Sequence, residues 1–262
     1  MRIYLALLGA SVRAQLAYRG AVWLEALGRF WVTSLELVGV LVVFTITDGL
    51  GGFGRWEVVY LYGVATTALG VASVVTDGLK DMPHLVRTGQ LDGMLVRPLS
   101  PLLQVLGRQC RLMQVGRPAQ GALTLLWALW HVAPDGPLRY GMVGVNVAAT
   151  TAVFSGLFVL EGASTVFTVQ AAEAFSAFTY GGAQMTQYPV PIYPAWLQRV
   201  FLWVVPVGTA CYLPALVVLG HPDPLGLPGW APWVAPLGAL AFFGACLLGW
   251  RAALDRYTGT GS

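Results

Sequence analysis

The chain has 262 residues, of which 56% are apolar and only 10% are charged, with 15 basic and 12 acidic side chains. A soluble domain carries about 25% charged residues to keep its surface in water, and a disordered chain is also rich in charge, so the composition excludes a disordered chain and an ordinary soluble enzyme. It predicts an all-α, polytopic membrane protein. No stretch resembles a linker, so we expect one transmembrane domain over residues 1–262.

Residues 1–21 are predicted to form an amphipathic helix that lies on the membrane surface. Its apolar residues recur at helical spacing: Leu5, Leu8, Val12 and Leu16. A cleaved signal peptide is the alternative, because Arg2 precedes a short apolar run. The interfacial helix is favoured because Arg13 and Arg19 follow that run at once, where they would lie among lipid headgroups.

Seven further segments are apolar over about the 20 residues that a membrane-spanning helix needs. They are residues 30–47, 58–76, 113–130, 140–160, 162–183, 200–220 and 234–250. Glycine- and proline-rich sequences separate several of them, as expected for loops.

The basic residues predict how these segments are oriented. With the N-terminus in the cytoplasm, twelve of the fifteen basic residues lie on the cytoplasmic side, and Arg55, Arg139 and Arg199 lie outside. Cytoplasmic loops carry an excess of Lys and Arg, so we expect this orientation. Seven crossings would place Arg251 and Arg256 outside, against the same bias. One segment must therefore fail to cross, which leaves six transmembrane helices and both termini in the cytoplasm.

The favoured non-spanning segment is residues 200–220, because Pro206 and Pro214 interrupt it. Together with the preceding proline-rich stretch, it is predicted to form an outer re-entrant helical pair, residues 188–220, before the last span. In the alternative, residues 162–183 do not cross, because Glu173 interrupts them. Both solutions give six crossings.

Charged residues also fall within or near the predicted spans: Glu36, Arg117 and Glu173. An ionised side chain at the bilayer centre costs at least about 2.5–3.5 kcal/mol on insertion scales, so such residues normally face protein or a water-filled cavity. We expect these three to line a transport pathway or to form an interhelical ion pair, such as Glu36 with an arginine. Snorkelling to the interface or a purely structural pair is the alternative.

The sequence contains no catalytic pattern. Its only lysine, Lys80, is not followed by Ser or Thr, so a phosphate-binding P-loop is absent. The three histidines and three cysteines are scattered, without the spacing of metal ligands, and no basic stripe interleaved with aromatics favours nucleic acid. We therefore expect a chain that is not an enzyme and that binds no metal, cofactor or nucleic acid.

Residues 77–101, between the second and third spans, are predicted to form an amphipathic element parallel to the membrane. Asp77, Asp81, His84 and Arg87 share one helical face, and Met82, Leu85 and Val86 share the other. A short helix should end at Gly89, and a second should end at Arg97-Pro98. This loop is either a solvated connection or a docking surface for a cytoplasmic protein.

The stretch from Arg87 to Pro101, RTGQLDGMLVRPLSP, resembles the signature of permease subunits of ABC-2 type export transporters. The interfacial helix, the segment from Tyr188 to Trp196 and the chain ending agree with it. The resemblance implies six spans, a cytoplasmic coupling helix that fits a groove of a separate ATP-binding subunit, and an outer gate of re-entrant helices, here with Pro206 and Pro214. The implied ATPase contacts are Asp81, His84, Arg87, Gln90, Leu91, Asp92 and Arg97.

The resemblance further implies a permease dimer, with an identical or homologous second permease, in the bacterial cytoplasmic membrane. ATP and Mg would be bound by the partner ATP-binding subunits, and membrane lipid would surround the dimer. Two other classes stay open. An ion-coupled secondary transporter would need Glu36 or Glu173 as a titrating site, and a non-transport assembly or scaffold protein would need neither cargo nor an ATPase.

Overall fold

The structure, a computed structural model, describes residues 15, 19–109, 111–223 and 225–257. Within these residues the chain is helical, with no strand beyond one isolated bridge between Leu50 and Phe53. The all-α prediction is therefore confirmed. Most of the predicted interfacial helix lies outside the described residues, and its last three residues, 19–21, belong to the first long helix instead.

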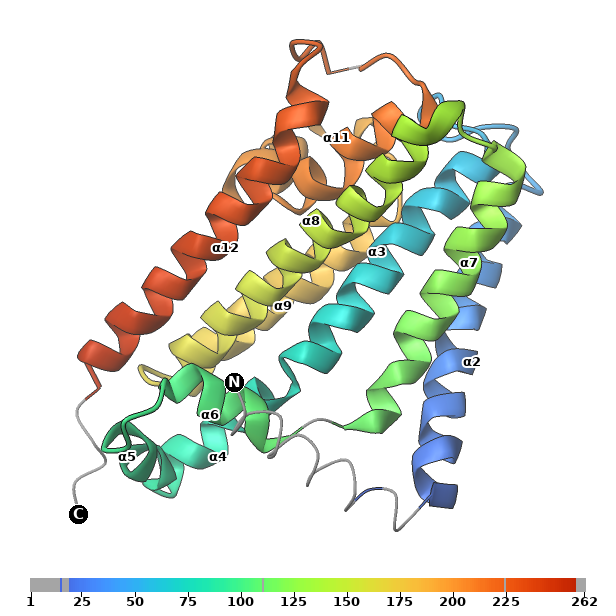
Figure 1. The fold of residues 1–262 in the computed structure, drawn as a ribbon. Helices are drawn as coiled ribbons and strands as arrows, with labels where there is room; N and C mark the ends of the chain where they lie inside the picture. The colour runs from blue at the N-terminus through green and yellow to red at the C-terminus, as the bar shows by residue number, and fades with distance from the viewer. Residues whose placement is uncertain (1–14, 16–18, 110, 224, 258–262) are drawn as a thin grey trace.

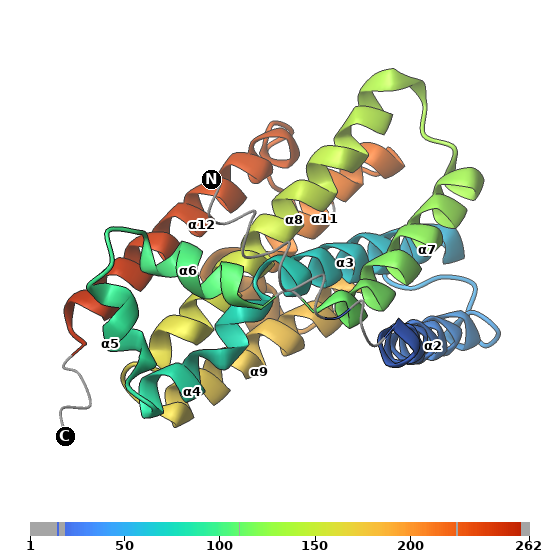
Figure 2. The same ribbon diagram turned by 60° about the horizontal axis from the view of Figure 1, so that its bottom comes forward.

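Long helices run side by side in alternating directions (Figure 1). They are α2 (Arg19–Val43), α3 (Arg55–Val75), α7 (Gly116–Val132), α8 (Gly136–Ser164), α9 (Val169–Thr186) and α12 (Ala231–Asp255). One end of the bundle, which we call the loop end, carries α4 (Met82–Arg87), α5 (Gln90–Leu95) and α6 (Pro101–Arg108). Figure 2 shows these short helices gathered on one side of the loop end, with α2 at the opposite edge of the bundle. The opposite end, the far end, carries α11 (Val207–Leu219).

Among the described residues, four helices are long and apolar enough to cross a membrane: α2, α3, α8 and α12. The segments Ala195–Val204 and Val207–Leu219 meet the same test only as a pair bent by 94°. Neither α7, which has 17 residues, nor α9 meets it. Length and composition thus support a multi-pass membrane protein with four to five candidate spans among the described residues, and they do not confirm the predicted count of six.

Two helix boundaries differ from the predicted spans. The first predicted span starts at residue 30, but α2 starts at Arg19, and an ion pair of 3.0 Å between Glu25 and Arg29 links successive turns of this added part. The predicted segment 162–183 is divided between α8 and α9. At this division the hydroxyl of Thr168 accepts a hydrogen bond from the backbone N–H of Ala171, which caps α9. Glu173 therefore lies within α9 and does not interrupt it.

Glycines let α7 pack very closely against α3. A Cβ atom added to Gly63 of α3 would lie 2.8 Å from the Cα of Leu125, and one added to Gly121 of α7 would lie 2.5 Å from the backbone nitrogen of Thr67. Small residues at a helix interface allow this approach, which supplies packing energy inside a membrane. The helices α3 and α7 are therefore closely packed against each other, and both contact η2 at the loop end.

Candidate functional site

The loop predicted to dock a partner forms two short helices, as its sequence pattern indicates. The 3-10 helix η1 (Asp77–Asp81) leads directly into α4, and Pro83 lies in the first turn of α4. Gly89 has a φ of 66°, a left-handed conformation that glycine adopts without strain, and it separates α4 from α5. We call η1, α4 and α5 together the coupling segment.

The apolar side of the coupling segment is buried against the loop-end part of α8, where a Cβ atom on Gly162 would lie 3.5 Å from Met82 Cγ. Met82 and Leu85 of α4 are completely buried, in one hydrophobic cluster that extends to Trp250 of α12. The cluster also contains Leu91 of α5, which is completely buried. Leu91 therefore supports the segment from inside, and the prediction that its side chain contacts an ATPase does not fit its burial. A displacement of the coupling segment would act first on the end of α8, because interiors are close-packed.

The polar side of the coupling segment faces outward. Its exposed polar residues His84, Arg87, Gln90 and Asp92, together with Arg97 just after α5, are here called the coupling surface. Two of them are held in place, since Arg108 donates to Gln90 Oε1 at 2.7 Å and the Nε of Arg87 donates to the Pro83 carbonyl at 3.1 Å. Asp81 is only partly exposed, because Gln109 donates to its carboxylate. Five of the seven predicted contact residues are thus exposed.

Asp77 is the largest departure from the predicted face pattern, because its side chain is completely buried. Its carboxylate lies 3.3 Å from Lys80 Nζ and accepts hydrogen bonds from Gln114 Nε2 and from the backbone N–H of Arg111, at 3.2 Å each. The Nε of Arg111 lies 3.7 Å away. Asp77 therefore joins the start of the loop to its end at η2 (Leu112–Val115). A helical wheel of residues 77–87 cannot show this, since the covering residues come from 111–114.

Lys80 shares this buried environment. Its side chain is 28% exposed, and burial lowers its pKa below the ordinary value, although the carboxylate of Asp77 acts in the opposite direction. The neighbouring cations Arg29 and Arg111 lower the pKa further. The loop end thus holds several cations close to one another at a partly desolvated position.

α6 packs against η1 and is hydrogen-bonded to the end of α5. A Cβ atom on Gly78 would lie 2.0 Å from the carbonyl oxygen of Val105, so only glycine allows α6 to pack this close to η1. The side-chain amide of Gln104 donates to the carbonyl oxygens of Met94 and Leu99, at 3.0 and 3.1 Å. These contacts make residues 77–115 one connected unit.

Of the three charged residues predicted within or near spans, Glu36 and Arg117 lie together, and Glu173 lies elsewhere. Arg117 at the start of α7 lies 3.5 Å from the Glu36 carboxylate on α2, so the arginine partner expected for Glu36 is Arg117. Glu173 takes no part in this pair and is exposed on α9.

The two prolines of the predicted outer gate have different roles. Pro206 lies at the 94° bend between the π-helix η4 (Val200–Val204) and α11. Pro214 lies inside α11 and does not break it, contrary to the sequence prediction that both prolines interrupt this segment. The polar groups of α8 that face α11 explain why: the Thr150 hydroxyl donates to the Ala210 carbonyl at 3.2 Å. With its nitrogen toward α11, the Asn146 amide donates to Ala210 and Cys211, each at 3.0 Å.

A second contact at the far end links the loop between α2 and α3 to the segment before α12. Glu57 of α3 accepts a hydrogen bond from the backbone of Gly54 at 2.7 Å and lies 2.6 Å from His221 Nε2. The His221 ring also stacks on Phe53, with 4.8 Å between ring centroids. The sequence pattern does not indicate this contact, because the residues are more than 160 positions apart.

The described residues contain no group of three or more His, Cys, Asp or Glu side chains that could hold a metal ion. Comparison with protein families gives a match to the ABC-2 family transporter protein model over residues 30–261. Comparison with curated proteins and with solved structures gives no match.

Proposed function

The chain belongs to the ABC-2 family of transporter proteins, and from this premise we propose that it is the membrane-spanning subunit of an ATP-driven exporter. The family provides the transport permease and not the ATPase. ATP and Mg would accordingly be bound by a separate ATP-binding subunit. A second permease, identical or homologous, would complete the translocation pathway in the bacterial cytoplasmic membrane.

The proposed topology has six spans, formed by α2, α3, α7, α8, α9 and α12. In support, α7 runs alongside α3, and α9 runs alongside α8 (Figure 1). The loop end would face the cytoplasm, because it carries Lys80, Arg87 and Arg97, whereas Arg55 and Arg139 lie at the start of helices entered from the far end. The bent pair at Pro206 would then be the outer re-entrant segment.

One observation carries the coupling proposal: the coupling segment has a buried apolar side that packs on α8 and an exposed polar side. Closure of the ATP-binding subunits on ATP would displace the coupling surface. Met82 and Leu85 would pass that displacement to α8 and, through the cluster they share with Trp250, to α12. Such coupling requires that the ATPase contacts the two states of the permease differently. The bend at Pro206 is the proposed outer gate, with Pro214 held rigidly inside α11.

The first test is purification of the full chain in mild detergent from its own host. The proposal expects an ATP-binding-cassette protein to co-purify and to hydrolyse ATP in the complex. If the chain instead transports cargo in vesicles without ATP, driven by an ion gradient, it is a secondary transporter. If it has neither an ATPase partner nor a cargo, it is a scaffold or an assembly protein.

The second test separates coupling from assembly. The variants Asp92→Ala and Arg97→Ala change exposed residues, so we expect unchanged thermal stability but loss of ATP-dependent transport. Arg55→Gln, an exposed cation at the start of α3 and outside the bent pair, is the matched control and should transport normally. Normal transport by both loop variants would show that the coupling surface is elsewhere.

A further inference from the structure

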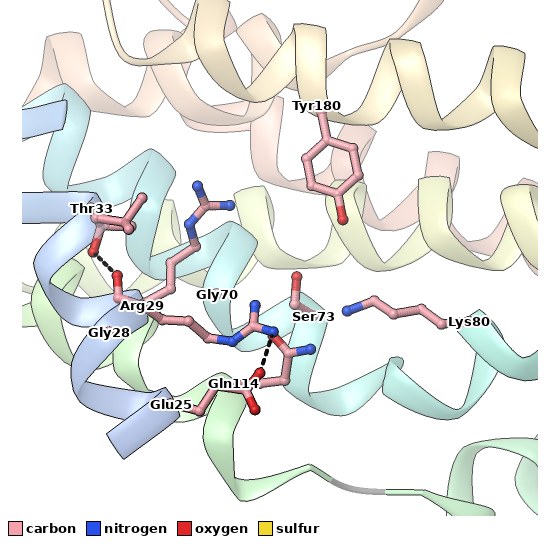
Figure 3. Close-up of a pocket in the computed structure, with 11 residues that line it drawn as sticks. Glu25, Gly28, Arg29, Thr33, Gly70, Ser73, Lys80, Gln114 and Tyr180 are labelled. Atoms are coloured by element: carbon pink, nitrogen blue, oxygen red, sulfur yellow. Dashed lines mark hydrogen bonds and ion pairs between the residues drawn. The ribbon is translucent and has the colours of Figure 1, made fainter. Parts of the chain in front are cut away.

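A cavity of about 460 Å³ lies at the loop end, beside α2 and away from the coupling surface. Residues of α2, α3, α7 and α9 line it together with the loop segments η1 and η2 (Figure 3). The lining residues that matter chemically are Glu25, Arg29, Ser73, Lys80, Arg117 and Tyr180. None of the residues of the coupling surface belongs to this lining.

The cavity is lined by three cations and one carboxylate. Arg29, Lys80 and Arg117 come from three separate parts of the chain, and Glu25 is the acidic member. Each cation contacts one carboxylate but keeps donors to spare: Arg29 donates to Glu25 at 3.0 Å, and Lys80 lies 3.3 Å from Asp77. Guanidinium has five N–H donors and ammonium has three, so an incoming anion can be bound without breaking these pairs.

Neutral donors point into the same space. Figure 3 shows the Tyr180 hydroxyl and the Lys80 ammonium directed toward the same space from different elements, with Ser73 close to the Lys80 ammonium. Ser73 is nearly fully buried, so its hydroxyl is placed inside the protein rather than on a solvated face. Hydroxyl, ammonium and guanidinium donors converging on one point are the groups that bind phosphate oxygens.

The site can bind an anion through unused donors and not through an excess of positive charge. Each of the three cations is paired with one carboxylate: Arg29 with Glu25, Lys80 with Asp77, and Arg117 with Glu36. Burial lowers the pKa of Lys80, and Arg29 and Arg111 lower it further, although Asp77 acts in the opposite direction. A phosphate oxygen at this partly desolvated position would accept from the N–H groups that the ion pairs leave unused.

An apolar stripe leads away from the cavity along α2. Val32 lines the cavity, and the exposed residues that follow it at steps of three or four, on the same side of the helix, are Leu35, Val38 and Val42. The stripe runs from the loop end toward the far end, which is the direction of an acyl chain whose headgroup lies at the loop end. A cationic cavity joined to an apolar stripe fits an amphiphile better than a free ion.

We propose that this cavity binds the phosphate-type headgroup of an anionic amphiphile, with its acyl chain along the Val32–Val42 stripe of α2. The inference concerns binding by the isolated permease, so it holds or fails independently of ATP-driven export. An exporter with such a site would take an anionic amphiphile from the cytoplasmic leaflet.

The test is a titration of the purified full chain in mild detergent with four probes. These are phosphatidic acid, phosphatidylcholine, diacylglycerol and inorganic phosphate. We expect phosphatidic acid to bind at least about tenfold more tightly than the other three, because only it combines an apolar chain with a phosphate monoester. If inorganic phosphate binds as tightly as phosphatidic acid, the ligand need not be an amphiphile and the proposal is wrong. If diacylglycerol binds as tightly as phosphatidic acid, the cavity is not an anion site and the proposal is also wrong.

A steric variant tests the location without changing any charge. Gly28 lines the cavity and has nothing within 4 Å of an added Cβ, so Gly28→Leu fills the cavity and should weaken phosphatidic acid binding about tenfold or more. Gly238→Leu, in α12 and outside both the cavity and the stripe, also has open space around an added Cβ and should bind like the wild type. Both variants replace a helical glycine, so neither should unfold its helix.

A charge variant completes the test. Arg29→Gln removes a guanidinium whose carboxylate partner, Glu25, is exposed, so folding should be retained. We expect about tenfold weaker phosphatidic acid binding, as for the loss of one charge-assisted hydrogen bond. Arg251→Gln, an exposed cation at the end of α12, is the control. Wild-type binding by both Gly28→Leu and Arg29→Gln would overturn the proposal.

Discussion

The hydroxyl of Thr150 on α8 lies 3.2 Å from the carbonyl oxygen of Ala210 on α11, and this carbonyl is the one that Pro214 leaves without its helical partner. A helical N–H binds the carbonyl four residues earlier, and proline has no N–H. An unpaired carbonyl inside a membrane costs free energy, so a neighbouring helix must supply the donor. The single Thr150 proton is shared with the Asn146 carbonyl at 2.8 Å, and the Asn146 amide also donates to Ala210 at 3.0 Å. Thr150 and Asn146 together therefore explain how α11 continues through Pro214.

The first prediction concerns that contact. Thr150→Val keeps the shape of the side chain but removes the donor, so we expect a loss of about 1 kcal/mol in the free energy of unfolding in detergent, within the range of interhelical hydrogen bonds in membranes. In a Pro214→Ala background the helix supplies its own N–H, and the loss should shrink. Thr151→Val is the control, because that hydroxyl bonds within its own helix, to Val147 at 2.7 Å. Equal losses in the two backgrounds would contradict the explanation.

The second prediction concerns Asp77. Asp77→Asn removes the negative charge of a completely buried carboxylate that lies next to Lys80 and Arg111. We expect a loss of about 2–3 kcal/mol, less than for a fully buried pair because both cations are partly exposed to solvent. Asp81→Asn, at a partly exposed carboxylate, should cost less. Chemical unfolding of the purified chain measures both, and a larger loss at Asp81 would refute the central position of Asp77.

The third prediction is a pH dependence from Lys80. Burial lowers its pKa below the ordinary value near 10.5, with Asp77 opposing and Arg29 and Arg111 adding to the shift. The unfolded chain therefore holds this proton more tightly than the folded chain. Well below the folded pKa the burial penalty is fully present, and it disappears as the pH rises through the folded pKa toward 10.5.

Lys80→Met isolates this effect. The free energy of unfolding of the wild type minus that of the variant should rise as the pH increases toward 10.5, because only the wild type carries the titrating ammonium. The measurement is chemical unfolding of both proteins at each pH. A difference that stays constant or falls with pH would mean that Lys80 is not destabilised by burial.

The fourth prediction compares two glycines of the loop. Gly78→Ala places a Cβ against the backbone of Val105, so α6 must move away from η1 and thermal stability should fall clearly. Gly93→Ala in α5 meets open space and replaces a helical glycine, which should be neutral or stabilising by up to about 1 kcal/mol. If Gly93→Ala nevertheless reduces ATP-dependent transport, the cause lies in contact with a partner and not in the fold of this chain.

Local features, such as the ends of helices, were predictable from the sequence. Burial by residues from other segments was not. Gly89, Arg97-Pro98 and Pro206 act on the backbone next to them, so the two short helices and the bend follow from the chain itself. The burial of Asp77 and Leu91 depends on residues from other segments, which no helical wheel contains.

The same distinction applies to Pro214 and to the end of α8. A proline inside an apolar segment indicates a break unless another helix supplies the missing donor, and Thr150 is 60 residues away in the chain. The division of residues 162–183 depends on the cap at Thr168, a short signal inside a continuous apolar run. The Glu36 partner was expected to be an arginine, and only the structure identifies it as Arg117.

The central claim is that the coupling surface contacts an ATP-binding subunit. The most direct measurement is photo-cross-linking from a single probe placed at Asp92, with a probe at Arg199 as control, in the purified complex reconstituted in nanodiscs. The account predicts a cross-link from position 92 to the ATP-binding subunit, changed in yield by ATP, and none from position 199. A complex that hydrolyses ATP but cross-links from position 199 and not from position 92 would contradict it.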